Sequence, residues 1–217
     1  MTPAETADRL VQNRLIPVIR YDRPEDGALA IECALRAGFP TVEITLSMPD
    51  ALDLVREFSR HLESHQLVGA GTVWNETDCE RVLTAGAAYV VSPGLVPGLG
   101  AQVHAGGAAY LPGALTPTEV AACLRDGADM VKIFPASTVG PKHLASIKAV
   151  FRGTRFCPTG SVSGANMEEW FAAGASCVGI GNTLFSAAAL ARRDQKALVE
   201  EAKHLLALLS LVPRQGK

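Results

Sequence analysis

The sequence predicts an α/β protein folded as a (β/α)8 TIM barrel with an extra helix at its N-terminus. Short β-branched runs alternate with longer amphipathic stretches, which is the pattern of parallel strand–helix units. An Ala-Gly or Asp-Gly pair recurs before several of these runs. The chain has 217 residues, of which 48% are hydrophobic and 19% charged. Because one barrel commonly takes up to about 250 residues, we expect residues 1–217 to form a single domain.

The predicted strands are apolar runs of four to eight residues, and there are eight of them. In order they are Leu15–Arg20, Thr41–Leu46, Leu67–Val73, Tyr89–Pro93, Ala109–Ala114, Met130–Pro135, Arg155–Val162 and Cys177–Asn182. The predicted helices between them open on Pro, Asp, Asn or Thr, which helix starts favour. They include Pro24–Ala37, Asp50–Leu62, Asn75–Ala85, Thr116–Leu124, Pro141–Val150 and Asn166–Ala173. Asp8–Asn13 and the run after Ala187 are predicted as terminal helices.

A weak internal repeat supports closure of the strands into a barrel. Glycines stand where helix C-caps are expected, at Gly38, Gly86, Gly106, Gly127 and Gly174. Their separations are close to one or two multiples of about two dozen residues, which is the length of one compact strand–helix unit. An open doubly wound sheet shares the alternation. It is disfavoured because no GxGxxG follows the first strand and no GKS or GKT is present.

Charge and cysteine content narrow the function classes. The formal net charge of −2, with both signs interspersed, argues against nucleic acid or anionic membranes as partners. No apolar run approaches the roughly 18 residues of a membrane span, and the first residues lack a signal-peptide core, so we expect a cytoplasmic protein. Five scattered cysteines without a CxxC pair predict reduced, buried thiols and no metal site.

Side-chain parity points to polar groups inside the barrel. In Thr41–Leu46, the apolar residues Val42, Ile44 and Leu46 form one face, which turns Glu43 inward. Burying a carboxylate costs free energy, so a carboxylate inside the barrel indicates either a paired group or a functional role.

The same parity points Lys132 inward, because Val131 and Ile133 form the helix-facing side of Met130–Pro135. Apolar surroundings disfavour the ammonium form, and a free amine can attack a ketone to form a Schiff base. Two structural alternatives stay open. Lys132 and Glu43 could form a buried ion pair, or Lys132 could extend out of the barrel mouth.

Other strands carry small or polar groups at their C-terminal ends, where barrel active sites are built. Thr72, Ser92-Pro93 and Thr159-Gly160 are such groups. Glycines in Gly160-Ser161 and Gly181-Asn182, after the last two strands, would let backbone amides approach an anion. Each glycine turn alone is also typical of an ordinary strand–helix connection.

Six segments at compatible spacings carry a resemblance to a known family. They are Val42–Leu46, Gly69–Val73, Ser92–Leu95, Leu111–Gly113, Val131–Ala136 and Phe156–Gly160. With them, the chain from about Leu15 to Asn182 resembles the 2-keto-3-deoxy-6-phosphogluconate (KDPG) aldolase family. That resemblance implies a homotrimeric class I aldolase that uses no metal or other cofactor.

The resemblance also implies roles for individual residues. Lys132 corresponds to the Schiff-base lysine, and Glu43 to the general acid/base. Thr72 and Thr159 match positions that hold the pyruvyl carboxylate. Pro93 and Phe134 match residues that shape the pocket.

Two departures from the family pattern affect the substrate. Ser47 stands where members acting on the gluconate usually have an arginine, and we expect Arg20 to supply the guanidinium instead, as in the 2-keto-3-deoxy-6-phosphogalactonate branch. Ser161 and Asn182 replace a glycine and a serine of the distal anion site, with Gly160 and Gly181 beside them. The side chains of Ser161 and Asn182 can still donate hydrogen bonds to an anion.

The leading expectation is therefore cleavage of a 2-keto-3-deoxy-6-phosphoaldonate into pyruvate and glyceraldehyde 3-phosphate. Three alternatives stay open. The first is an aldolase acting on 4-hydroxy-2-oxoglutarate or another 2-keto-3-deoxy acid. The second is a sugar-phosphate isomerase or epimerase in which Lys132 only pairs with Glu43. The third is a barrel that binds sugar phosphates without catalysis.

Overall fold

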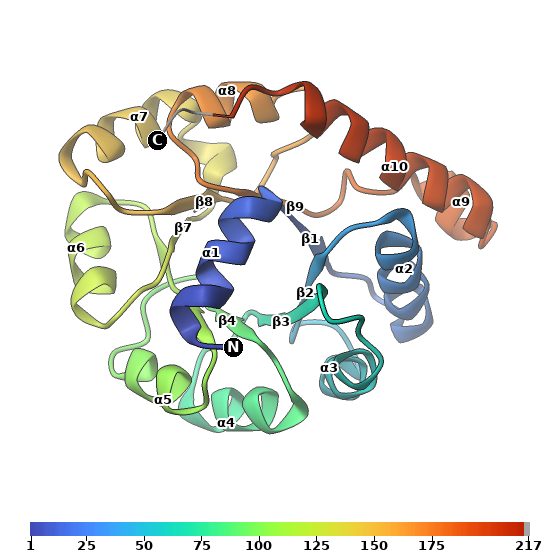
Figure 1. Ribbon diagram of the computed structural model, residues 1–217, viewed down its shortest axis with the longest axis horizontal. Helices are drawn as coiled ribbons and strands as arrows, with labels where there is room; N and C mark the ends of the chain where they lie inside the picture. Colours follow the sequence, from blue (N-terminus) through green and yellow to red (C-terminus); the bar gives the residue numbers. More distant parts are fainter. Residues whose placement is uncertain (215–217) are drawn as a thin grey trace.

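The computed structural model describes residues 1–214 as a layer of parallel strands surrounded by helices (Figure 1). The strands are β1 (Leu15–Ile19), β2 (Thr41–Thr45), β3 (Leu67–Gly71), β4 (Tyr89–Val91), β5 (Ala109–Leu111), β6 (Gly113–Ala114), β7 (Val131–Ile133), β8 (Phe156–Pro158) and β9 (Val178–Ile180). The helices are α1 (Pro3–Asn13), α2 (Pro24–Ala37), α3 (Ala51–Arg60), α4 (Glu76–Ala85), α5 (Leu99–Ala105), α6 (Pro117–Arg125), α7 (Pro141–Val150), α8 (Met167–Ala172), α9 (Ala187–Ala191) and α10 (Gln195–Leu211), with a 3-10 turn, η1, at Ala136–Thr138.

Six strands form one curled parallel sheet in the order β5-β4-β3-β2-β1-β9, and β6-β7-β8 form a second parallel sheet. A bridge between Thr159 and Gly179 links the end of β8 to β9. Every pairing in both sheets is parallel, which places the C-terminal ends of all strands at one edge. The α/β class and the parallel pairing predicted from the sequence are confirmed.

One predicted strand, Ala109–Ala114, is divided in two by Pro112. Proline has no N–H to donate to a strand ladder, so the pairing is interrupted there. The Pro112 carbonyl still accepts a hydrogen bond from the Lys132 N–H at 2.9 Å. The other seven predicted strands are present but end earlier than expected. In Arg155–Val162, for example, the strand stops at Pro158 because Gly160 and Ser161 have positive φ angles of 104° and 60°.

Helix boundaries follow the predicted caps closely. Pro24–Ala37 and Pro141–Val150 are confirmed to the residue. Gly38 ends α2 in the left-handed region at φ 104°, where glycine avoids the Cβ clash. The helix α5 was not predicted, but Gly106 is its C-cap, as expected; Gly106 has φ −79°, and the left-handed residue is the next one, Gly107, at φ 78°.

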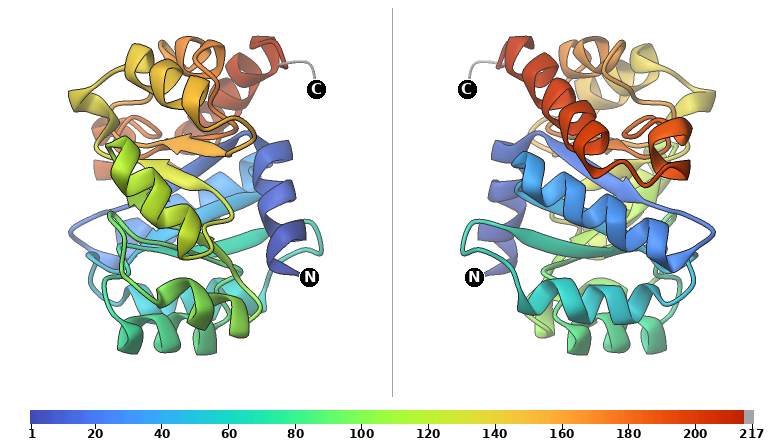
Figure 2. Two further views of the ribbon diagram at one scale, coloured as in Figure 1. Left: turned by 90° about the vertical axis from the view of Figure 1, so that its left-hand side faces the viewer. Right: turned by 90° about the vertical axis from the view of Figure 1, so that its right-hand side faces the viewer.

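The helix α1 packs against the N-terminal ends of the strands, as the two side views show (Figure 2). Its Thr2 and Glu5 form a capping box, and the helix ends at Arg14 with φ 65°. Ala7 and Leu10 of α1 join a second core cluster that includes the strand residues Ile16 and Tyr89 and also Met130, which directly precedes β7. We call this face, opposite the C-terminal ends of the strands, the basal face.

The parity predicted for the strands is confirmed by the packing. Val42, Ile44, Val131 and Ile133 lie in the larger apolar cluster that includes residues of the surrounding helices. All five cysteines are buried and free, as predicted. None of the helices between residues 1 and 214 combines the length and apolar character needed to cross a bilayer.

Candidate active site

Lys132 and Glu43 meet between the two parallel sheets, since β7 belongs to one and β2 to the other. Lys132 is the central residue of β7 and Glu43 the central residue of β2, and parity turns both inward. The Lys132 Nζ donates to Glu43 Oε1 at 3.3 Å, with side-chain exposures of only 5% and 3%. Removing two charged groups from water is costly, and a paired geometry offsets part of that cost. The alternative in which Lys132 extends out of the mouth is therefore wrong.

Gly71 makes room for the carboxylate. A Cβ atom built on Gly71 would lie 2.1 Å from Glu43 Oε1, far inside van der Waals contact. Any larger residue here would displace Glu43 from Lys132. The Gly69-Ala70-Gly71 run is visible in the sequence, but the reason for its last glycine lies in the neighbouring strand, where Thr45 pairs with Gly71.

A cavity of about 250 Å³ opens beside Lys132 at the C-terminal ends of the strands. Eight of the predicted site residues line it. They are Arg20, Lys132, Phe134, Thr159, Gly160, Ser161, Gly181 and Asn182. Val18, Val162 and Thr183 also line it, and the sequence reading missed them. Thr183 directly follows Asn182, so its position in the same loop was the available signal.

The Phe134 ring forms one apolar wall next to the amine, with Nζ 5.3 Å from the ring centroid. Thr159 is buried, and its hydroxyl lies above Gly179, where a Cβ would approach Oγ1 to 2.4 Å. The amine of Lys132, the hydroxyl of Thr159 and the ring of Phe134 therefore line the same cavity.

Arg20 and Thr72 lie together although 52 residues separate them. The Arg20 Nη2 donates to Thr72 Oγ1 at 3.4 Å, and the Arg20 side chain is exposed at the end of β1. Ser47 does not line the cavity, and its hydroxyl donates to Thr45 Oγ1 at 3.3 Å. The Arg20 guanidinium, at the end of β1, therefore lies at the edge of the cavity, whereas the Ser47 hydroxyl donates its hydrogen bond to Thr45.

The turn after β8 is held by side-chain contacts. The Asn166 Nδ2 donates to the Ser161 carbonyl at 2.9 Å, and Thr183 Oγ1 donates to the Val162 carbonyl at 3.2 Å. The first bond lies within the loop after β8, and the second connects that loop with the loop after β9. The two glycine-containing loops predicted to face an anion are brought together on one side of the cavity.

Two predicted site residues, Glu43 and Thr72, do not line the cavity themselves but bond to Lys132 and Arg20, which do. The third predicted residue outside the lining is Pro93. It follows β4 and lies against β6, since a Cβ on Gly113 would come within 2.1 Å of the Pro93 carbonyl oxygen. Its contact is with the neighbouring strand backbone. Within residues 1–214, no group of three or more His, Cys, Asp or Glu side chains is arranged to hold a metal ion.

Comparison with known proteins agrees with this geometry. The family described as KDPG and KHG aldolase matches residues 6–200. A probable 2-dehydro-3-deoxy-6-phosphogalactonate aldolase of Rhizobium meliloti is 31% identical over 81% of this chain and 83% of its own length. The KHG/KDPG aldolase of Escherichia coli K12 is 32% identical over 89% and 91%.

Among solved structures, the KDPG aldolase of Legionella pneumophila, with pyruvate captured as a covalent carbinolamine intermediate, superposes with a TM-score of 0.83 at 27% identity. The alignment covers 94% of this chain and 98% of that one. Fold and relatives define the chain as a carbon–carbon lyase of the aldolase type. It belongs to the KDPG and KHG aldolase family.

Proposed function

We propose that this protein is a class I aldolase that cleaves a 2-keto-3-deoxy-6-phosphoaldonate into pyruvate and glyceraldehyde 3-phosphate. The observation that carries the proposal is the buried contact of Lys132 Nζ with Glu43 Oε1, at 3.3 Å, beside an open cavity. A lysine amine in its neutral form adds to a ketone, and a neighbouring carboxylate can carry the protons that the later steps move. The chemistry proposed needs no metal and no organic cofactor.

In the first half of the reaction, Lys132 acts as the nucleophile. Its Nζ adds to the C2 ketone, and loss of water from the carbinolamine gives an iminium. The iminium then accepts the electron pair of the C3–C4 bond, which yields an enamine and releases the aldehyde. Phe134 and the strand residues around Lys132 limit water near the iminium.

Glu43 is the proton carrier in both halves. Its carboxylate takes the proton from the C4 hydroxyl as the C3–C4 bond breaks. It then returns a proton to C3 of the enamine, and hydrolysis of the resulting imine releases pyruvate and the free lysine. One carboxylate can serve both steps because cleavage leaves Glu43 protonated, as protonation of the enamine requires, and that second step leaves it deprotonated for the next cleavage.

The two ends of the substrate are assigned to opposite sides of the cavity. Arg20, Thr72 and Thr159 hold the pyruvyl carboxylate, and the contact of Arg20 with Thr72 supports this assignment. The distal phosphoryl group is assigned to the loops with Gly160, Ser161, Gly181 and Asn182. Gly160 and Ser161 have positive φ angles, a conformation in which successive backbone N–H groups turn toward one side. Phe134 shapes the space between the two ends, and Pro93 supports the rim.

The finer architecture is part of the same proposal. We propose that the two sheets close into one (β/α)8 barrel, with α1 as an extra helix across its basal face. The Thr159–Gly179 bridge and the Lys132 bond to Pro112 support closure at the two junctions. We further propose a single domain over residues 1–217, a homotrimer and a cytoplasmic location.

Borohydride trapping tests the covalent step. When the protein is incubated with pyruvate and sodium borohydride, we expect a reduced pyruvyl adduct on Lys132, because an iminium is the group that borohydride reduces. Peptide mapping by mass spectrometry locates it. Lys142, which is exposed on α7, is the internal control and should stay unmodified.

Absence of an adduct on Lys132 would contradict the aldolase proposal and favour an isomerase or a binding protein. Where the adduct forms, the ratio of kcat/KM for the phosphorylated sugar acid and for 4-hydroxy-2-oxoglutarate identifies the substrate. A higher value for the shorter acid would contradict the assignment of a distal phosphoryl site.

Replacing Arg20 with alanine tests the carboxylate subsite. We expect the dissociation constant for pyruvate to rise roughly tenfold or more, since a charge-assisted hydrogen bond is lost and the hydroxyls of Thr72 and Thr159 donate more weakly. Isothermal titration calorimetry on the Arg20→Ala protein measures it. The control is Arg23→Ala, because Arg23 is paired with Asp26 at the start of α2. Equal constants in the two variants would assign Arg20 to loop bracing.

A further inference from the structure

A second cavity, of about 410 Å³, lies on the basal face, opposite the candidate active site. Its lining comes from the end of α1, the C-terminal part of α7, the connection from α8 to β9, and the segment after α10. Three of its residues are cationic, namely Arg14, Lys148 and Arg214. None of its lining residues is acidic.

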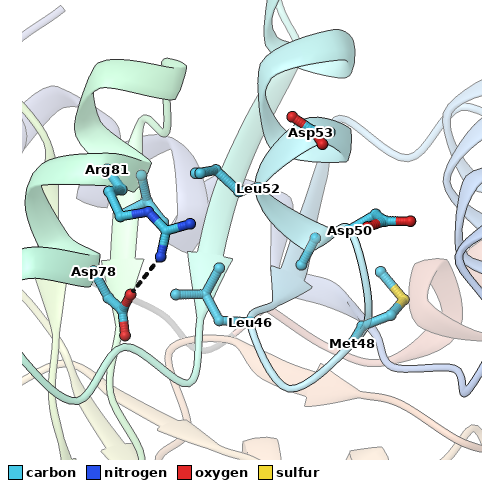
Figure 3. A pocket seen from close by; sticks show the side chains of 9 residues that line it. Leu46, Met48, Asp50, Leu52, Asp53, Asp78 and Arg81 are labelled. Carbon is cyan, nitrogen blue, oxygen red and sulfur yellow. Dashed lines mark hydrogen bonds and ion pairs between the residues drawn. The ribbon is translucent and has the colours of Figure 1, made fainter.

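The three cations have no carboxylate partner among residues 1–214. This contrasts with the cavity of about 360 Å³ between the start of α3 and α4, which Figure 3 shows. There Arg81 is neutralised by Asp78 at 3.2 Å, and Asp50 and Asp53 are close by. The formal net charge of the chain is −2, whereas this cavity brings together three cations that lack a carboxylate partner in the described part of the chain. The local charge is therefore opposite in sign to that of the whole chain.

Arg14 is the fixed part of this cavity. Its side chain donates to the carbonyls of Leu209, Val212 and Pro213 at 2.9 to 3.2 Å and lies 4.4 Å from the Phe171 ring centroid. These acceptors are neutral, so they hold the guanidinium in place without cancelling its charge. Burial lowers the pKa of Arg14, and the nearby charge of Arg214 lowers it further.

Lys148 contributes a second, partly buried charge. Its Nζ donates to the Thr154 carbonyl at 2.6 Å, and the ammonium keeps further donors beyond that bond. Burial lowers the pKa of this amine as well. In a neighbouring cavity, also lined by Arg14 and Arg214, the buried Asn13 Nδ2 has no hydrogen-bond partner among the described residues. The linings of these two cavities therefore contain cations and no carboxylate.

We infer that the cavity lined by Arg14, Lys148 and Arg214 is a binding site for a small, multiply charged oxyanion, such as the phosphoryl end of a metabolite. A guanidinium and an ammonium converging from different elements match the several oxygens of such a group. The cavity volume falls within the range of small-molecule sites, so it has room for more than a lone ion. The site is separate from the proposed reaction chemistry, because Lys132 and Glu43 open toward the other face.

Calorimetric titration with inorganic pyrophosphate at low ionic strength tests the inference. The variant is Lys148→Met with Arg214→Gln, which removes two cations and leaves Arg14 to hold the C-terminal segment. We expect the affinity of the basal site for pyrophosphate to fall roughly tenfold or more. The matched control is Lys142→Met with Arg152→Gln, which removes the same charges from exposed positions on and next to α7.

Any pyrophosphate bound at the active site contributes equally to both variants, and unchanged aldolase activity in both shows that the fold is kept. Crystals soaked in selenate then locate the anion, with an anomalous peak expected within hydrogen-bond distance of Lys148. If the Lys148 change destabilises the fold, the single Arg214→Gln variant, at an exposed residue, gives the same comparison. Equal affinities in variant and control, or a basal cavity without a selenate peak, would overturn the inference.

Discussion

Replacement of Lys132 by methionine is expected to lower kcat/KM for aldol cleavage roughly 10⁴-fold or more, the scale on which removal of a covalent nucleophile acts. Methionine fills a similar volume beside Phe134 but has no amine, so no iminium forms. A coupled assay for pyruvate release measures the rate. Borohydride treatment with pyruvate should leave the variant unlabelled.

The stability of this variant needs its own measurement, because Glu43 loses its partner. Removing one member of a buried ion pair typically costs about 3–5 kcal/mol of unfolding free energy. The double variant, Lys132→Met with Glu43→Gln, has no unpaired charge and should recover part of that loss while staying inactive. Lys142→Met, at an exposed lysine of α7, should keep full activity. An active, well-folded Lys132→Met protein would rule out Schiff-base chemistry at this site.

Replacement of Glu43 by glutamine is expected to lower kcat roughly 10²- to 10⁴-fold, the usual contribution of general acid–base catalysis. Glutamine fits the space that Gly71 leaves and still accepts a hydrogen bond from Lys132. It cannot take the C4 hydroxyl proton or return one to the enamine. Exchange of the pyruvate methyl protons with deuterium, followed by NMR, reports the second of these transfers and should slow to a similar extent.

Borohydride should still trap pyruvate on Lys132 in the Glu43→Gln protein, since imine formation needs the amine rather than the carboxylate. This readout separates a proton carrier from a residue that only holds the lysine in place. Glu57→Gln, at an exposed glutamate of α3, is the matched control. Proton exchange at the normal rate in Glu43→Gln would move the acid/base role to another group.

The local elements and their faces were predictable from the sequence. Period-two alternation in Thr41–Leu46 and Met130–Pro135 is enough to separate the helix-facing set from Glu43 and Lys132, because a strand side chain has only two directions. Helix limits such as Pro24–Ala37 follow from a proline start and a glycine end. The predicted ends of the strands were less accurate, because strand ends depend on turns such as Gly160-Ser161, which lines the cavity.

The sequence by itself determined the order of strands and helices, and it determined that Lys132 and Glu43 lie on the strand faces opposite to the helix-facing ones. Only the tertiary structure decided that the two atoms meet at 3.3 Å, that Gly71 leaves space for the carboxylate, and that Arg20 reaches Thr72. It also gathered Arg14, Lys148 and Arg214 around one basal cavity. The reason is physical: periodicity along one element sets the direction of a side chain, whereas distances between elements depend on register, curvature and packing across the whole sheet.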